Sequence, residues 1–354
     1  MTGKTSWQKL VKNSISRPEQ LSGFPGIDRE MIAAVSRVYP MRVNPYYMGL
    51  IRQAGDPLWR QAIPEIRELQ DQTGMEDPLD EENLSPVPNL VRKYPDRVLF
   101  LVSSRCSMYC RFCTRKRKVG RREMVIDDKT IGAGLEYIKE HKEIREVLLS
   151  GGDPLMLDDE RLERILRALR EIKSVEVIRI GTRIPCTLPM RVTRKLAGIL
   201  KKYHPLYINT HFNHPAEITP EAALACTRLA DAGIPLACQT VLLKGVNDDR
   251  EIIRELMCRL LQIRVKPYYL FQADLTRGAD HFRTPVATGL EIMRHLIGRV
   301  SGMAVPTFAL DAPGGGGKIP LTPGYVTSLD ENSLDFLTCQ GNACSYPNPI
   351  SEDR

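Results

Sequence analysis

After about residue 97, short apolar runs alternate with longer segments in which apolar residues recur at helical spacing. The short runs are typical of buried strands, and we expect strands at 98–103, 147–150, 175–181, 206–211, 235–243, 265–272 and 305–310. The amphipathic segments between them predict helices at 129–140, 159–172, 193–203, 220–232, 249–261 and 286–301. Regular alternation of strand and helix implies an α/β fold with a parallel sheet, and six such units predict a partial, TIM-like (β/α)6 barrel.

The chain before this alternation has a different pattern. Helical periodicity over 31–38 and 58–69 is broken repeatedly by prolines, which predicts short helices. The acidic stretch 76–82 looks like a linker. We therefore expect three parts: an N-terminal helical region and linker at 1–90, a barrel with a glycine-rich loop at 91–325, and a short C-terminal tail at 326–354.

The composition of the chain indicates where in the cell the protein works. The 354 residues are 42% hydrophobic and 26% charged, which is ordinary for a soluble protein. The start of the chain lacks the apolar segment of a signal peptide, and no apolar run approaches about 18 residues, so we expect no membrane span. Nine unevenly spread cysteines do not form a disulfide framework, so a reducing, cytoplasmic location is expected.

The net charge of +7 is partly local. Seven basic residues crowd one segment: Arg111, Arg115, Lys116, Arg117, Lys118, Arg121 and Arg122. One interpretation is a nucleic-acid surface, and the other is a solvated loop with one or two arginines turned towards small anions. We favour the second, because no RNA-binding signature accompanies the run, and we do not expect a nucleic-acid partner.

Three cysteines with the spacing C-x3-C-x2-C follow the first predicted strand: Cys106, Cys110 and Cys113. Iron–sulfur clusters are normally held by four thiolates. Three thiolates within eight residues, with no fourth cysteine before Cys186, therefore predict a cubane cluster with one open iron that binds a substrate or cofactor. The alternative is a structural zinc site.

Parallel barrels carry their working residues where the strands end. The residues found there are Ser150, Gly151, Gly152, Asp153, Arg183, His211, His214, Gln239 and Asp274. The two glycines let the backbone approach a ligand, and Arg183 indicates either an anionic ligand or a surface salt bridge. We expect the histidines to form hydrogen bonds and not to ligate a metal. Gln239 needs a polar partner if it is buried.

Four glycines at 314–317 precede Lys318. The segment is not a phosphate-binding P-loop, because Ala312 and Ile319 stand where that motif needs glycine and serine or threonine. What remains is a flexible loop that brings Lys318 to the barrel mouth. A lysine placed there can form an imine with a carbonyl cofactor, usually pyridoxal 5′-phosphate.

The cysteine segment 105–115 resembles the cluster loop of radical S-adenosylmethionine enzymes. The resemblance implies a 4Fe–4S cluster that binds S-adenosylmethionine, with Phe112 against the adenine and Ser150, Gly151, Gly152 and Asp153 near the methionyl amino group. Together with segments 209–215, 245–248, 266–269, 281–285 and 311–318, it is similar to the lysine 2,3-aminomutase family from about residue 6 to about residue 325.

That resemblance implies an isomerase that interconverts L-lysine and L-β-lysine by means of a 5′-deoxyadenosyl radical and a pyridoxal phosphate imine. Lys318 would form the imine, Arg115 would bind the substrate carboxylate, and Asp274 and Asp311 would bind the distal ammonium group. Gln239 would lie at the pyridoxal phosphate group or ring.

Partners follow from the same resemblance: L-lysine, a one-electron reductant such as flavodoxin or ferredoxin, and further copies of the chain in a homo-oligomer. Longer relatives join their subunits through zinc, with a cysteine just after the Gly-Val-Asn-Asp segment. Asp249 stands at that position here, and the tail holds only Cys339 and Cys344, so we do not expect that zinc site.

Several alternatives stay open. The substrate could be arginine, whose guanidinium also pairs with carboxylates, whereas a glutamate enzyme should not keep both Asp274 and Asp311. The β-lysine could serve to modify a translation factor. The basic run allows a radical enzyme acting on RNA, and the cysteines alone allow an iron–sulfur sensor, which would not need Lys318.

Overall fold

The computed structural model describes residues 7–21, 23–121 and 124–348. Its main feature is a sheet in which successive strands along the chain pair in parallel. The parallel strands are β2 (Arg97–Ser103), β3 (Glu146–Gly151), β4 (Val177–Gly181), β5 (Leu206–Thr210), β6 (Leu236–Leu242), β7 (Lys266–Gln272) and β8 (Thr307–Ala312). The predicted strands are all present, so the prediction of a parallel sheet is confirmed.

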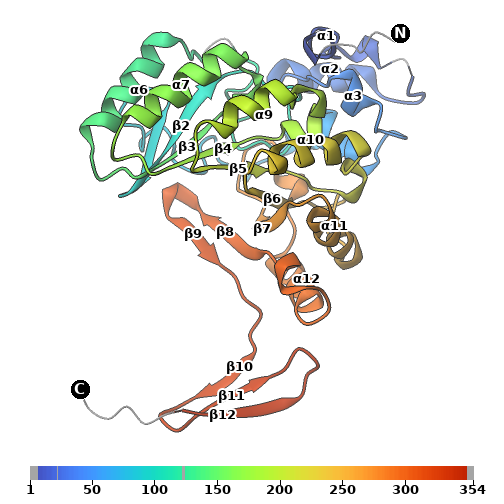
Figure 1. The fold of residues 1–354 in the computed structure, drawn as a ribbon. Helices are drawn as coiled ribbons and strands as arrows, with labels where there is room; N and C mark the ends of the chain where they lie inside the picture. The colour runs from blue at the N-terminus through green and yellow to red at the C-terminus, as the bar shows by residue number, and fades with distance from the viewer. Residues whose placement is uncertain (1–6, 22, 122–123, 349–354) are drawn as a thin grey trace.

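One helix longer than a turn or two connects each pair of parallel strands and covers the sheet (Figure 1). These helices are α6 (Asp128–Glu140), α7 (Asp159–Glu171), α9 (Arg194–Lys201), α10 (Pro220–Asp231), α11 (Arg250–Gln262) and α12 (Val286–Leu296). Side-chain caps begin most of them; Asp158 and Thr193, for example, accept hydrogen bonds from the backbone of the first turn. The six strand–helix units confirm the predicted partial (β/α)6 barrel.

Two further strands extend the sheet at its edges. β1 (Leu90–Tyr94) pairs antiparallel with β2, and β9 (Gly317–Pro320) pairs antiparallel with β8. In the described residues β1 and β9 do not pair with each other, so the barrel is open between them. Neither edge strand was predicted, because both are short and adjoin prolines or glycines.

The N-terminal region consists of short helices, as expected: α1 (Trp7–Lys12), α2 (Arg29–Val38), α3 (Pro45–Met48), α4 (Pro57–Ala62) and α5 (Arg67–Gln70). The helix expected over 58–69 is divided into α4 and α5. Ile63, which precedes Pro64, is extended with φ −105° and ψ 135°, since proline disfavours the helical conformation in the residue before it.

Shorter elements complete the connections: α8 (Ile184–Thr187) and the 3-10 turns η1 (Pro18–Gln20), η2 (Pro154–Met156), η3 (Pro189–Arg191), η4 (Pro215–Glu217), η5 (Asp280–Phe282), η6 (Gly302–Ala304) and η7 (Pro313–Gly315). The end of the chain forms an antiparallel sheet of β10 (Val326–Leu329), β11 (Ser333–Leu337) and β12 (Ala343–Pro347), drawn apart from the barrel in Figure 1. Among the described residues, no helix has the length and apolar character needed to cross a membrane.

Candidate active site

A cavity of about 300 Å³ lies at the carboxyl ends of the parallel strands. Every parallel strand from β2 to β7 contributes to its lining, either near its end or through the loop that follows. The structure brings most of the predicted site residues together here: Cys106, Cys110, Phe112, Cys113, Arg115, Ser150, Gly152, Asp153, Arg183, Gln239 and Asp274. We call this space the cysteine cavity.

The three cysteines face this cavity without forming a site for a single ion. In the described part of the chain, no three cysteine, histidine, aspartate or glutamate side chains lie close enough to hold one metal ion. Burial raises the pKa of Cys113 to about 11 and that of Cys106 well above its usual value, so metal binding at these thiols must release protons.

Arg183 has a carboxylate partner within the chain itself. Its Nη2 atom lies 2.7 Å from Oε1 of the buried Glu217, and its Nη1 atom lies 2.9 Å from Sγ of Cys110. The surface salt bridge left open by the sequence is therefore ruled out, because both partners are buried. The guanidinium sits between a carboxylate and a predicted cluster ligand.

The Gly-Gly-Asp segment after β3 is shaped mainly by its contacts with neighbouring strands. A Cβ atom on Gly151, whose φ is +136°, would lie 2.1 Å from the carbonyl oxygen of Ser103, so β2 and β3 could not approach as they do. The Asp153 carboxylate accepts hydrogen bonds from the Thr182 hydroxyl at 2.7 Å and from the Arg183 backbone at 2.8 Å. Burial raises the pKa of Asp153 to about 6. These internal bonds join the ends of β3 and β4.

Aromatic and amide groups line the opposite part of the cysteine cavity. The rings of Phe112 and His211 lie 5.5 Å apart, and His211 forms a hydrogen bond of 2.8 Å with Asn213. Burial lowers the pKa of His211 to about 3, so this histidine is neutral, as its predicted hydrogen-bonding role requires. Gln239 lines the cysteine cavity and is absent from the lining of the cavity around Lys318. The predicted contact of Gln239 with pyridoxal phosphate stays a prediction.

A second cavity of about 150 Å³ surrounds Lys318, and we call it the lysine cavity. The Nζ atom of Lys318 lies 3.2 Å from Oδ1 of Asp311. The lining also holds the cations Lys93, Arg97 and Arg179. An amine next to several cations suits a carbonyl cofactor that carries a phosphate.

Sequence reasoning missed these three cations. Lys93 lies on β1 and Arg97 begins β2, and the two flank the turn at Tyr94-Pro95-Asp96. Two basic residues on either side of a tight turn were a usable signal, but β1 was not predicted. Arg179 lies within β4, where its pairing with Glu146 at 2.8 Å resembles an ordinary cross-strand ion pair.

The two cavities meet at charged residues. Asp274 lines the cysteine cavity and Asp311 lines the lysine cavity. The pKa of Asp274 is raised to about 7 by burial and then by the charge of Asp311. Arg115 and Glu81 form a salt bridge across the same junction: Arg115 lines the cysteine cavity and Glu81 lines the lysine cavity. The junction thus presents acids that favour a cation and an arginine that favours an anion.

The basic run after the cysteines is largely neutralised by acids of the N-terminal region. Among the described residues, Glu68 pairs with Arg111 and Lys116, Glu81 with Arg115, and Glu82 with Lys118. Two expectations need correction: the run is not mainly a solvated loop, and the acidic stretch 76–82 is not a free linker. The same pairing removes most of the charge on which an RNA surface would depend.

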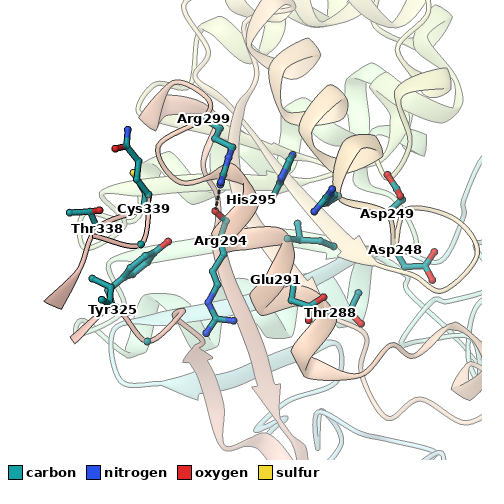
Figure 2. Close-up of a pocket in the computed structure, with 16 residues that line it drawn as sticks. Asp248, Asp249, Thr288, Glu291, Arg294, His295, Arg299, Tyr325, Thr338 and Cys339 are labelled. Atoms are coloured by element: carbon teal, nitrogen blue, oxygen red, sulfur yellow. Dashed lines mark hydrogen bonds between the residues drawn. The ribbon is translucent and has the colours of Figure 1, made fainter. Parts of the chain in front are cut away.

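A larger cavity, of about 660 Å³, lies away from the strand ends, between α12 and the C-terminal tail (Figure 2). Asp249 faces this cavity together with Cys339. Within the described residues, Cys339 is the one thiol in the lining. The cavity holds none of the predicted site residues.

Comparison with known proteins identifies the family. Residues 100–257 match the radical SAM superfamily, and residues 293–352 match the family described as lysine-2,3-aminomutase. The L-lysine 2,3-aminomutase of Acetoanaerobium sticklandii is 49% identical over 97% of this chain and 84% of its own length. The chain belongs to the lysine 2,3-aminomutase family. Its fold is the partial barrel of radical SAM enzymes, and its cofactors are a 4Fe–4S cluster, S-adenosylmethionine and pyridoxal phosphate.

Relatives with different named substrates are almost equally similar to this chain. The L-lysine 2,3-aminomutase of Clostridium subterminale is 47% identical over 98% of the chain and 84% of that protein. The glutamate 2,3-aminomutase of Clostridioides difficile is 46% identical over 95% of the chain and 80% of that protein. Overall identity therefore does not distinguish the substrates, and the side chains at the junction must.

Proposed function

We propose that this member of the lysine 2,3-aminomutase family interconverts L-lysine and L-β-lysine. The observation that carries the proposal is the pair of carboxylates, Asp274 and Asp311, where the two cavities meet. A buried ammonium group needs compensating negative charge, and the distal ammonium of lysine supplies the matching cation. A glutamate side chain would bring a third carboxylate to the same place, at a large electrostatic cost.

The other side chains fit complementary roles. Cys106, Cys110 and Cys113 would hold the cluster, and the rest of the cysteine cavity would hold S-adenosylmethionine. Lys318 would bind the pyridoxal carbonyl, with Lys93, Arg97 and Arg179 near its phosphate. Arg115 would bind the substrate carboxylate, because a guanidinium edge matches a carboxylate in geometry and charge.

When bound, the cluster and S-adenosylmethionine supply a radical that abstracts hydrogen, and pyridoxal phosphate supplies the carbonyl that holds the migrating amino group. The chain's own residues orient these groups. Asp311 accepts a hydrogen bond from Nζ of Lys318 at 3.2 Å and so directs the amine. The enclosed strand ends keep water from the reacting atoms, and the charges at both ends of the substrate fix which carbon faces the cysteine cavity.

The deciding experiment is an anaerobic incubation of the reconstituted enzyme with S-adenosylmethionine, a strong chemical reductant and one of lysine, arginine or glutamate. We expect β-lysine from lysine and no β-amino acid from glutamate. Faster turnover of arginine than of lysine would contradict the proposed substrate, and no turnover of any of the three would contradict the aminomutase reaction itself.

We further propose that a flavodoxin or ferredoxin supplies the electron, that the enzyme is a homo-oligomer and that it works in the cytoplasm. All nine cysteines are free thiols in the structure, which supports a reducing compartment. Reduction of the cluster by purified flavodoxin or ferredoxin, and the mass of the protein in solution, would test the first two statements.

A further inference from the structure

An acidic segment, which we call the strap (residues 77–82), runs between the two catalytic segments of the chain. On one side, Asp77 lies 3.0 Å from Arg117 and Glu82 lies 3.0 Å from Lys118, just after the cysteines. On the other side, the carbonyl of Pro78 accepts a hydrogen bond of 3.0 Å from Gly314, in the glycine loop before Lys318. The strap is therefore held on both sides of the junction between the cavities.

Glu81 turns inward from the strap and forms a two-point pair with Arg115. Its carboxylate receives Nε of Arg115 at 2.8 Å and Nη2 at 2.6 Å, and Glu81 is only 5% exposed. On its other side, Nη1 of Arg115 lies 3.3 Å from the hydroxyl of Ser150 and 3.4 Å from the carbonyl of Gly151. Glu81 therefore holds the Nε and Nη2 atoms of the guanidinium, whereas Nη1 makes only the two longer contacts with Ser150 and Gly151.

This pair forms part of the wall between the cavities, because Arg115 lines the cysteine cavity and Glu81 lines the lysine cavity. An arginine side chain has many rotamers, and ordering it costs conformational entropy. Because Glu81 already holds the Nε side of Arg115, the arginine side chain is ordered before the substrate binds.

We infer that Glu81 is a positioning residue for the substrate carboxylate: by holding Nε and Nη2 it fixes the guanidinium of Arg115 in the lining of the cysteine cavity, where the carboxylate would bind. The inference rests on the proposed function, since it assumes that Arg115 binds the carboxylate of lysine. Glu81 does not touch the substrate in this arrangement and acts through Arg115.

The test compares Glu81→Gln with Glu82→Gln, a matched control in the same strap. Glu82 pairs with Arg117 and Lys118 and its side chain is 58% exposed, so its loss leaves Arg115 held. We expect Glu81→Gln to raise the KM for lysine by about tenfold or more while kcat changes by less than about threefold, because a ground-state contact is weakened. Glu82→Gln should keep both values. An unchanged or lower KM in Glu81→Gln overturns the inference.

Lysinamide, which lacks the carboxylate, provides a readout that a purely structural role would not move. Wild-type enzyme should bind lysine much more tightly than lysinamide, and Glu81→Gln should lose most of this preference. A retained preference in Glu81→Gln overturns the positioning role. If wild-type enzyme itself shows no preference for lysine over lysinamide, Arg115 does not bind the carboxylate. That result would contradict the role of Arg115 in the proposed function and not the positioning role of Glu81 alone.

A double-mutant cycle with Arg115→Lys isolates the route of the effect. In that background Glu81→Gln should add less than about a twofold change in KM, since the positioned guanidinium is already gone. A full tenfold effect there would show that Glu81 acts elsewhere and would overturn the inference. Should Glu81→Gln not fold, Glu81→Asp replaces it: the shorter acid must still raise the KM for lysine, and an unchanged KM refutes the assignment.

Discussion

The cysteine cavity and the lysine cavity adjoin each other but are built in different ways. The cysteine cavity draws on the ends of consecutive parallel strands, with its three thiols inside eight residues of sequence. The lysine cavity combines residues of the parallel strands β2, β3, β4 and β8 with residues of the antiparallel edge strands β1 and β9 and of the strap. One site thus follows from a regular repeat and a local motif, while the other also needs edge strands and a strap that only the folded chain brings to the barrel.

The strongest test of this division removes one cavity's chemistry at a time. Lys318→Ala should abolish the visible absorbance of bound pyridoxal phosphate and all detectable turnover, because it removes the amine proposed to hold the carbonyl, yet iron content should stay at the wild-type level. The reciprocal control is Cys113→Ala, which should lose the cluster absorbance and keep that of pyridoxal. Pyridoxal absorbance that survives in Lys318→Ala would refute the cofactor assignment.

Substitution of an acid at the junction between the cavities should reduce activity nearly as strongly as Lys318→Ala. Asp274→Asn removes one of the two charges proposed for the substrate ammonium, and breaking a buried ion pair costs about 3–5 kcal/mol. We expect kcat/KM for lysine to fall by roughly 10²- to 10³-fold, with both cofactor absorbances unchanged. Asp231→Asn, an exposed acid on α10, is the control and should have no effect. Wild-type kinetics in Asp274→Asn would show that this acid does not hold the substrate.

A pH profile examines the same acid without changing its size. Burial and the neighbouring Asp311 raise the pKa of Asp274 to about 7, so its carboxylate is charged above that pH and protonated below it. The lysine ammonium stays charged throughout this range, so kcat/KM should fall as pH drops below about 7, by about tenfold per unit. The profile should flatten in Asp274→Asn. An acidic limb that persists in that variant would belong to another group.

The smallest expected effect concerns Gln239, which lines the cysteine cavity and for which we propose a contact with S-adenosylmethionine. Loss of one neutral hydrogen bond costs about 1 kcal/mol, so Gln239→Ala should raise the KM for S-adenosylmethionine roughly fivefold. The affinity for pyridoxal phosphate, measured by absorbance titration, should not change. Weaker binding of pyridoxal phosphate in Gln239→Ala would show that Gln239 contacts pyridoxal phosphate, and the two cavities would then not bind separate cofactors.

Much of the barrel could be predicted because its signals are local. The spacing of apolar residues and the capping residues both act within one helix. For this reason α7 begins where Asp158 can cap it, and α9 begins after Thr193. The edge strand β1 was not predicted because its five residues show little hydrophobic periodicity. The cations Lys93 and Arg97 were therefore not predicted as site residues either. The linker interpretation of the strap failed for a related reason: an acidic run in sequence does not reveal its partners.

By itself the sequence determined the strand–helix repeat, the cysteine motif, the glycine loop with Lys318 and the family resemblance. Each of these depends on residues within a few turns of one another, or on the tendency of parallel strands to align their carboxyl ends. Only the tertiary structure decided that Glu81 meets Arg115, 34 residues away, and that the charge of Asp311 acts on the buried Asp274. Charges attract without regard to sequence distance, so their pairing is set by where the backbone places them and by how little water remains between them.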